Sequence, residues 1–196
     1  MDRRDFFRAG LKKVTKTVVN EIDARVEKKA KRYIRPPYAL NEVEFLLACT
    51  RCDDCFDACP HDVIFKLSTK LGADVVGTPA LALLKKGCHL CEDWPCVTAC
   101  TTGALKLAET STDEGAAGDQ EHESPFPRLA KASINEATCL PFSGPECGAC
   151  VPDCPVPNAI TLEMEKPRID MTYCVGCGLC REACILEEKA INIASL

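Results

Sequence analysis

Apolar residues near the start of the chain recur at the three- and four-residue spacing of a helix. They fall at positions 11, 14, 18, 22, 26, 30 and 33, and the pattern stops before Pro36-Pro37. This period predicts one long amphipathic helix in the N-terminal arm, residues 1–37. A shorter helix is predicted over 41–48, immediately before the first of several cysteine clusters.

Further along the chain the apolar pattern changes to the two-residue alternation of strands. A strand is predicted over 63–67, and the connection after it is broken at Gly72 and at Gly77-Thr78-Pro79. Residues 159–165 and 168–173 alternate on either side of Lys166-Pro167, which predicts a β-hairpin with its turn there. One more strand is expected over 191–193.

Charge is distributed unevenly. Residues 1–37 hold twelve of the 24 Lys and Arg but only five of the 29 Asp and Glu. The basic helix is expected either to lie on an anionic membrane or a partner, or to pack along the rest of its own chain. Residues 109–125 contain six acids, no Lys or Arg and no large apolar side chain, so they predict a disordered acidic loop, 109–128, between two units.

The chemistry is concentrated in sixteen cysteines among 196 residues. They form four groups: Cys49, Cys52, Cys55, Cys59; Cys88, Cys91, Cys96, Cys100; Cys139, Cys147, Cys150, Cys154; and Cys174, Cys177, Cys180, Cys184. The last group has the C-x2-C-x2-C-x3-C spacing of a [4Fe-4S] site, in which the fourth cysteine binds the other cluster of a pair. Gly176 and Gly178 allow the tight turn that this loop needs. The sequence therefore predicts four [4Fe-4S] clusters with these sixteen cysteines as iron ligands.

The spacing disfavours two other uses of the cysteines. A disulfide scaffold would not repeat C-x2-C units that are each closed by x3-C, and a zinc ribbon would split its ligands into separated pairs. His89, inside the second motif, is interpreted as a structural or surface residue because four cysteines already complete that site. Trp94-Pro95 in the same motif is expected to shield the cluster from water.

The spacing between motifs favours one pairing over another. Cys174 follows Cys154 by only twenty positions, so motif three is paired with motif four, and motif one with motif two. The rival pairing joins two with three and one with four. The preferred pairing predicts an α+β fold of two ferredoxin-like βαβ units, 38–108 and 129–196, each holding two [4Fe-4S] clusters.

Residues 34–193 resemble the NapG/MauM group of ferredoxin-type proteins, which is related to NapF. The resemblance rests on Arg35-Pro36-Pro37, on the Cys-x2-Cys-Glu-Asp-x-Pro-Cys form of residues 88–96, on the Cys-x7-Cys-x2-Cys-x3-Cys-Pro form of residues 139–155, and on residues 183–188. It implies four [4Fe-4S] clusters and electron transfer between a quinol-oxidising membrane partner and a soluble reductase.

No residue set indicates catalysis, and no Gly-rich phosphate loop supports flavin or nicotinamide binding. Four thiolate ligands leave a cluster no open coordination site, which favours one-electron relay between protein partners, without a small-molecule substrate or nucleic acid. The alternatives are an assembly factor for a molybdenum reductase such as periplasmic nitrate reductase, and a permanent subunit of a larger oxidoreductase.

The N-terminal arm also bears on location. Arg3-Arg4 resembles a twin-arginine export signal, but no uncharged run of even seven residues follows it within the arm. A cytoplasmic protein that touches the inner face of the membrane is therefore expected, with periplasmic export through a degenerate signal as the alternative.

Overall fold

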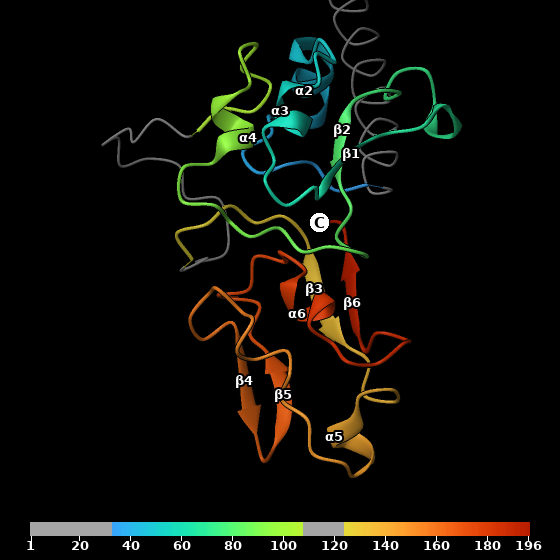
Figure 1. Cartoon of the computed structure of the whole chain (residues 1–196), viewed down its shortest axis with the longest axis vertical. Helices are drawn as coiled ribbons and strands as arrows, with labels where there is room; N and C mark the ends of the chain where they lie inside the picture. Colours follow the sequence, from blue (N-terminus) through green and yellow to red (C-terminus); the bar gives the residue numbers. More distant parts are fainter. Residues whose placement is uncertain (1–32, 108–123) are drawn as a thin grey trace, which may run out of the picture.

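The computed structural model describes residues 33–107 and 124–196. The predicted basic helix, apart from its last residues, and most of the predicted acidic loop lie outside the described residues. No helix in the described ranges is long and apolar enough to cross a membrane. The described residues form two halves, one above the other along the longest axis of the molecule (Figure 1).

Both halves consist of short helices and two-stranded antiparallel sheets, so the predicted α+β class agrees with the structure. The first half contains α2 (Glu42–Ala48), α3 (Asp54–Asp57), β1 (Ile64–Lys66), the 3-10 turn η1 (Thr69–Leu71), β2 (Pro79–Leu81) and α4 (Pro95–Thr98). The second half contains β3 (Lys131–Ile134), α5 (Leu140–Ser143), β4 (Ile160–Glu163), β5 (Lys166–Ile169), α6 (Leu179–Glu182) and β6 (Ile191–Ala194).

The two halves repeat one plan. In each, an antiparallel strand pair lies between the two cysteine motifs: β1 with β2, and β4 with β5. A second antiparallel pairing joins the segments on either side of both motifs. In the second half this is β3 with β6, and in the first half it is a single bridge between Ala39 and Leu105.

Local sequence accounts for the predicted elements. The side chain of Asn41 accepts a hydrogen bond from the Glu44 amide (3.1 Å) and caps α2, whose Phe45 is completely buried. The predicted strands over 63–67 and 191–193 are present as β1 and β6.

Three expectations about the strands were wrong. The hairpin turn lies at Met164 and Glu165, both with positive φ, and Lys166-Pro167 begins β5. Pro79 begins β2 where a break was expected, and a proline is tolerated there because it is the first residue of a strand. All strand pairs in the described residues are antiparallel, whereas the strands of a βαβ unit run parallel.

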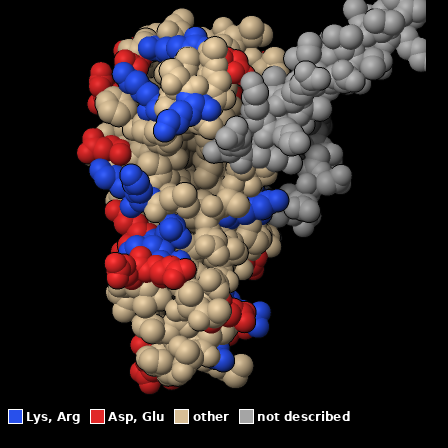
Figure 2. Space-filling view, turned by 90° about the vertical axis from the view of Figure 1, so that its right-hand side faces the viewer, with Lys and Arg blue, Asp and Glu red and all other residues tan. Residues whose placement is uncertain are grey.

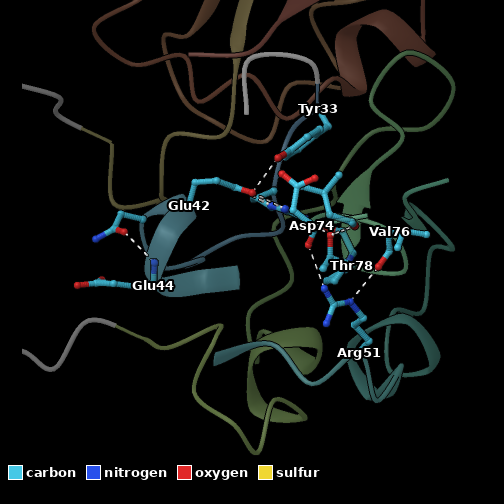
Figure 3. A network of polar contacts seen from close by, with 11 residues as sticks. Tyr33, Glu42, Glu44, Arg51, Asp74, Val76 and Thr78 are labelled. Carbon is cyan, nitrogen blue, oxygen red and sulfur yellow. Dashed lines mark hydrogen bonds and ion pairs between the residues drawn. The ribbon is translucent and has the colours of Figure 1, made fainter. Parts of the chain in front are cut away.

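Arg35, which is largely buried, holds the entry segment to the first half; its partners Glu42 and Thr78 and the neighbouring Tyr33 are labelled in Figure 3. Arg35 donates to both carboxylate oxygens of Glu42 (2.9 and 2.6 Å), to the Thr78 hydroxyl and to the Pro79 carbonyl. Its guanidinium carbon lies 4.4 Å from the ring centroids of both Tyr33 and Phe45. This network ties the segment before α2 to α2 and β2.

One apolar core extends through both halves. It joins Phe45 and Leu83 of the first half to Leu129 and Val175 of the second, and several cysteines of both halves belong to it. On the face in Figure 2, Lys and Arg side chains are interspersed with Asp and Glu, so that face presents no large area of one charge.

Candidate functional site: four cysteine-lined cavities

The sixteen cysteines gather in four groups of four, and each group lines its own cavity. The groups are Cys49, Cys52, Cys55 and Cys100; Cys59, Cys88, Cys91 and Cys96; Cys139, Cys147, Cys150 and Cys184; and Cys154, Cys174, Cys177 and Cys180. We call these cavities A, B, C and D in that order. Cavities A and B lie in the first half of the chain, and C and D in the second.

Each cavity takes three cysteines from one motif and the fourth from the other motif of the same half. Cys154, the last cysteine of motif three, lines cavity D with three cysteines of motif four. Cys59 and Cys100 are exchanged between cavities A and B in the same way. The structure therefore groups the cysteines as the preferred pairing of motifs predicts, and the rival pairing of two with three is absent from it.

Left-handed backbone turns help to bring the cysteines around cavities A, B and D. Asp53, Trp94 and Gly178 all have positive φ and directly precede the one-turn helices α3, α4 and α6, which carry Cys55, Cys96 and Cys180. Among these turns the sequence signalled only Gly178, because glycine is the residue usually expected at positive φ.

Gly176 is required for a second reason. A Cβ added at this residue would lie 2.1 Å from the carbonyl oxygen of Ala130, closer than any real contact. The motif-four loop therefore packs directly against the strand entry of the second half, where the Leu129 and Ala130 amides both donate to the Val175 carbonyl.

Burial makes these thiols hard to ionise in the absence of a cation. It raises the pKa of Cys88, Cys96 and Cys177 to about 12, and that of Cys55 and Cys150 to about 11. Neighbouring cysteines of the same cavity raise these pKa values further. Four thiolates around one cavity are stable only with a positively charged group between them, and an iron–sulfur core supplies such charge.

The donor sets fit a cluster better than a single ion. No group of three or more His, Cys, Asp or Glu side chains within residues 33–107 and 124–196 is placed to hold one metal ion. The four cysteines of each group stand around a cavity instead of converging on a point. A zinc site would need four ligands at bonding distance from one atom.

Cavity B has an aromatic wall. Trp94 lines it, is buried, and packs edge-on against Tyr38 (centroids 5.0 Å apart). This placement agrees with the expected shielding role. His89 is exposed at the rim and stacks on His61 with centroids 3.6 Å apart. This stacked pair could not be predicted from the sequence, because His61 follows the first motif whereas His89 lies within the second.

Comparison with known proteins identifies the family. Over 175 residues the chain is 36% identical to the ferredoxin-type protein NapG of Escherichia coli, and the match covers 83% of this chain and 71% of that protein. The chain belongs to the NapG and MauM group of ferredoxin-type proteins. The resemblance stated from the motifs is thus confirmed, and relatives of this kind support an iron–sulfur electron-transfer role for this NapG/MauM-type chain.

Other relatives place it within the same group. It is 37% identical over 172 residues to the methylamine utilization ferredoxin-type protein MauM of Methylobacillus flagellatus. The match covers 82% of this chain and 67% of that protein. The ferredoxin-type protein NapF of Escherichia coli is more distant, at 29% identity over 162 residues. No protein-family model and no solved structure matches the chain.

Proposed function

We propose that this protein binds four [4Fe-4S] clusters, one in each of cavities A to D, and relays electrons one at a time between protein partners. The observation that carries the proposal is the sorting of all sixteen cysteines into four sets of four, each around its own cavity. When bound, each cluster supplies reversible storage of one electron.

The chain's own residues have three tasks in this function. The cysteines hold iron as thiolates, the buried apolar residues around cavities B and D exclude water, and the tight turns fix the loops so that little rearranges when charge changes. Side chains such as Trp94 lower the local dielectric, which helps to set the potential. Every cysteine of a quartet is needed as a ligand, so none remains for substrate chemistry.

We infer partners of one chemical class, one-electron redox proteins. One is expected to reduce the relay, with a quinol-oxidising membrane protein as the favoured candidate, and another to accept electrons from it. The relay is favoured over assembly of a reductase because four cavities with complete thiolate sets are redundant for a protein that only binds a precursor.

Metal analysis of anaerobically prepared protein tests the cofactor part. About sixteen iron and sixteen sulfide per chain are expected, since each quartet takes one Fe4S4 core. Stoichiometric zinc without sulfide would contradict it. The relay part is tested by replacing Cys177 with alanine, confirming that the variant folds, and following partner binding and electron flux separately. Relay predicts lost flux with retained binding, whereas an assembly role predicts failed maturation of a reductase that stays active once made.

A further inference from the structure

The two halves meet at the loops that hold cavities B and D. The amide of Cys88 donates a hydrogen bond to the carbonyl of Cys177 (2.7 Å), which links a cysteine of cavity B directly to one of cavity D. Beside it, the Gly87 amide donates to the Glu182 carboxylate (2.6 Å). The Arg181 guanidinium also donates to the Leu84 carbonyl (3.1 Å). Three hydrogen bonds thus join residues about ninety positions apart in sequence.

Glycines make this contact as close as backbones allow. A Cβ at Gly87, which is buried, would lie 2.7 Å from the Cα of Leu179. A Cβ at Gly178 would lie 3.2 Å from the Leu83 carbonyl oxygen. Each glycine therefore packs directly against the backbone and side chain of a leucine in the other half, Gly87 against Leu179 and Gly178 against Leu83.

Cavities B and D are also the more buried pair. Cys88 and Cys96 of B are buried, as are Cys174, Cys177 and Cys180 of D, and all of these cysteines except Cys180 belong to the core shared by the two halves. None of the four cysteines of cavity A is buried, and Cys52 is exposed. Only Cys150 is buried in cavity C.

Exposed apolar side chains lie beside the two outer cavities. Phe56 and Phe65, each 40% exposed, line cavity A. Ile185, 68% exposed, lines cavity C directly after Cys184. Apolar groups at the edge of a redox site are suitable for contact with another protein, because they exclude water where the two surfaces meet.

We propose that cavities A, B, D and C form one relay in that order, with the Cys88–Cys177 contact as the crossing between halves. The inference rests on the proposed function and deepens it. One electron given up by a reduced donor protein passes along the relay to an oxidised acceptor protein. No bond is made or broken, and no proton is transferred.

The test opens the B–D contact without touching a cysteine. Gly87→Ala forces a Cβ into the Leu179 backbone, and its control is Gly148→Ala, where the new Cβ would meet only the Leu162 side chain at an ordinary 3.5 Å. Glu182→Ala removes the partner of the Gly87 amide, and its control is Glu163→Ala, at an exposed ion pair. All variants are loaded with iron and sulfide anaerobically and reduced with sodium dithionite.

Two readouts are independent of any partner. Hydrogen exchange of the Cys88 amide reports whether the contact is open, and it is expected to become about tenfold faster in Gly87→Ala and Glu182→Ala. Electron paramagnetic resonance of the fully reduced protein reports magnetic interaction between clusters. In the same two variants the interaction between the clusters of cavities B and D is expected to weaken, so that only the interactions within each half remain. The controls are expected to match the unmodified protein in both measurements.

The possible outcomes separate this inference from the function on which it rests. Unmodified protein lacking iron and sulfide would refute the proposed function. Fully loaded protein whose magnetic interaction is unchanged while the Cys88 amide exchanges faster would refute the B–D crossing and leave the proposed function standing. If Gly87→Ala loses iron, Glu182→Ala decides between these results.

Discussion

Arg35 allows a sharp test of how the entry segment is held. Its ion pair with Glu42 is buried, with side chains only 11% and 9% exposed. Replacing Arg35 with methionine keeps much of the contact with Tyr33 and Phe45 but leaves the Glu42 carboxylate buried without its cation. Breaking one side of a buried pair costs about 3–5 kcal/mol, so the variant is expected to lose that much stability.

The double variant distinguishes the ion pair from simple loss of packing. Removing both charges, with Arg35→Met and Glu42→Gln together, eliminates the uncompensated carboxylate. It is expected to be more stable than the sum of the two single changes by at least about 1.5 kcal/mol. The matched control is Arg168→Met, which breaks an ion pair with Glu163 whose side chains are 70% and 58% exposed. That change is expected to cost less than about 1 kcal/mol.

The assay is urea unfolding of anaerobic protein at constant protein, iron and sulfide concentrations, followed by circular dichroism. Arg35→Met is expected to lower the midpoint by about 1.5–2.5 M, given a slope of about 2 kcal/mol per molar urea. A loss equal to that of Arg168→Met, or strict additivity in the double variant, would refute the reasoning that the buried pair holds the segment.

Three further predictions concern the cavities. Gly176→Ala is expected to lose about four iron per chain, because its Cβ would lie 2.1 Å from the Ala130 carbonyl oxygen. The control is Gly103→Ala, where the added Cβ would meet no atom within 4 Å, and this variant is expected to keep all of its iron. Iron analysis of both variants tests the prediction. Cys154→Ala is expected to alter the spectrum of the same cluster as Cys174→Ala, and resonance Raman difference spectra that point to two different clusters would contradict the grouping. Removing iron with a chelator is expected to abolish most of the circular dichroism, because the remaining elements are too short to be stable alone; an unchanged spectrum would contradict this.

The grouping of the cysteines could be predicted because it depends on local spacing. A C-x2-C-x2-C loop brings its three cysteines around one cavity, and the short gap from Cys154 to Cys174 limits the choice of pairing. The positions of Gly176 and Gly178 were informative for the same reason, since both have the positive φ that such a loop requires.

Details of the strands depend on partners that the local pattern does not contain. Pro167 is typical of a turn, yet it lies in β5. Proline is tolerated there because each strand of a two-stranded sheet has one edge without a partner strand, where a missing amide hydrogen costs no hydrogen bond. Strand β3 was not predicted. Its partner β6 lies nearly sixty residues away, and only that pairing turns Lys131–Ile134 into a strand.

Contacts between motifs were also invisible in the sequence. The His61–His89 stack and the Gly87–Glu182 hydrogen bond each join residues that have no pattern in common. The family motif contains Arg35 without indicating a role for it, and the hydrogen bonds to Glu42, Thr78 and Pro79 show that it holds the entry segment.

Both halves of the described chain contain little regular secondary structure. Four of its five described α-helices have a single turn, and each strand has three or four residues, so within residues 33–107 and 124–196 backbone hydrogen bonding alone is a weak source of stability. Buried cysteines contribute to the core in both halves, where larger apolar side chains would otherwise pack.

The raised pKa values of these cysteines mean that the unloaded core holds neutral thiols. Binding iron must therefore release protons, and acid is expected to favour cluster loss. Folding, cluster binding and the contact between halves are therefore coupled, because cavities B and D are built from the same residues that join the halves.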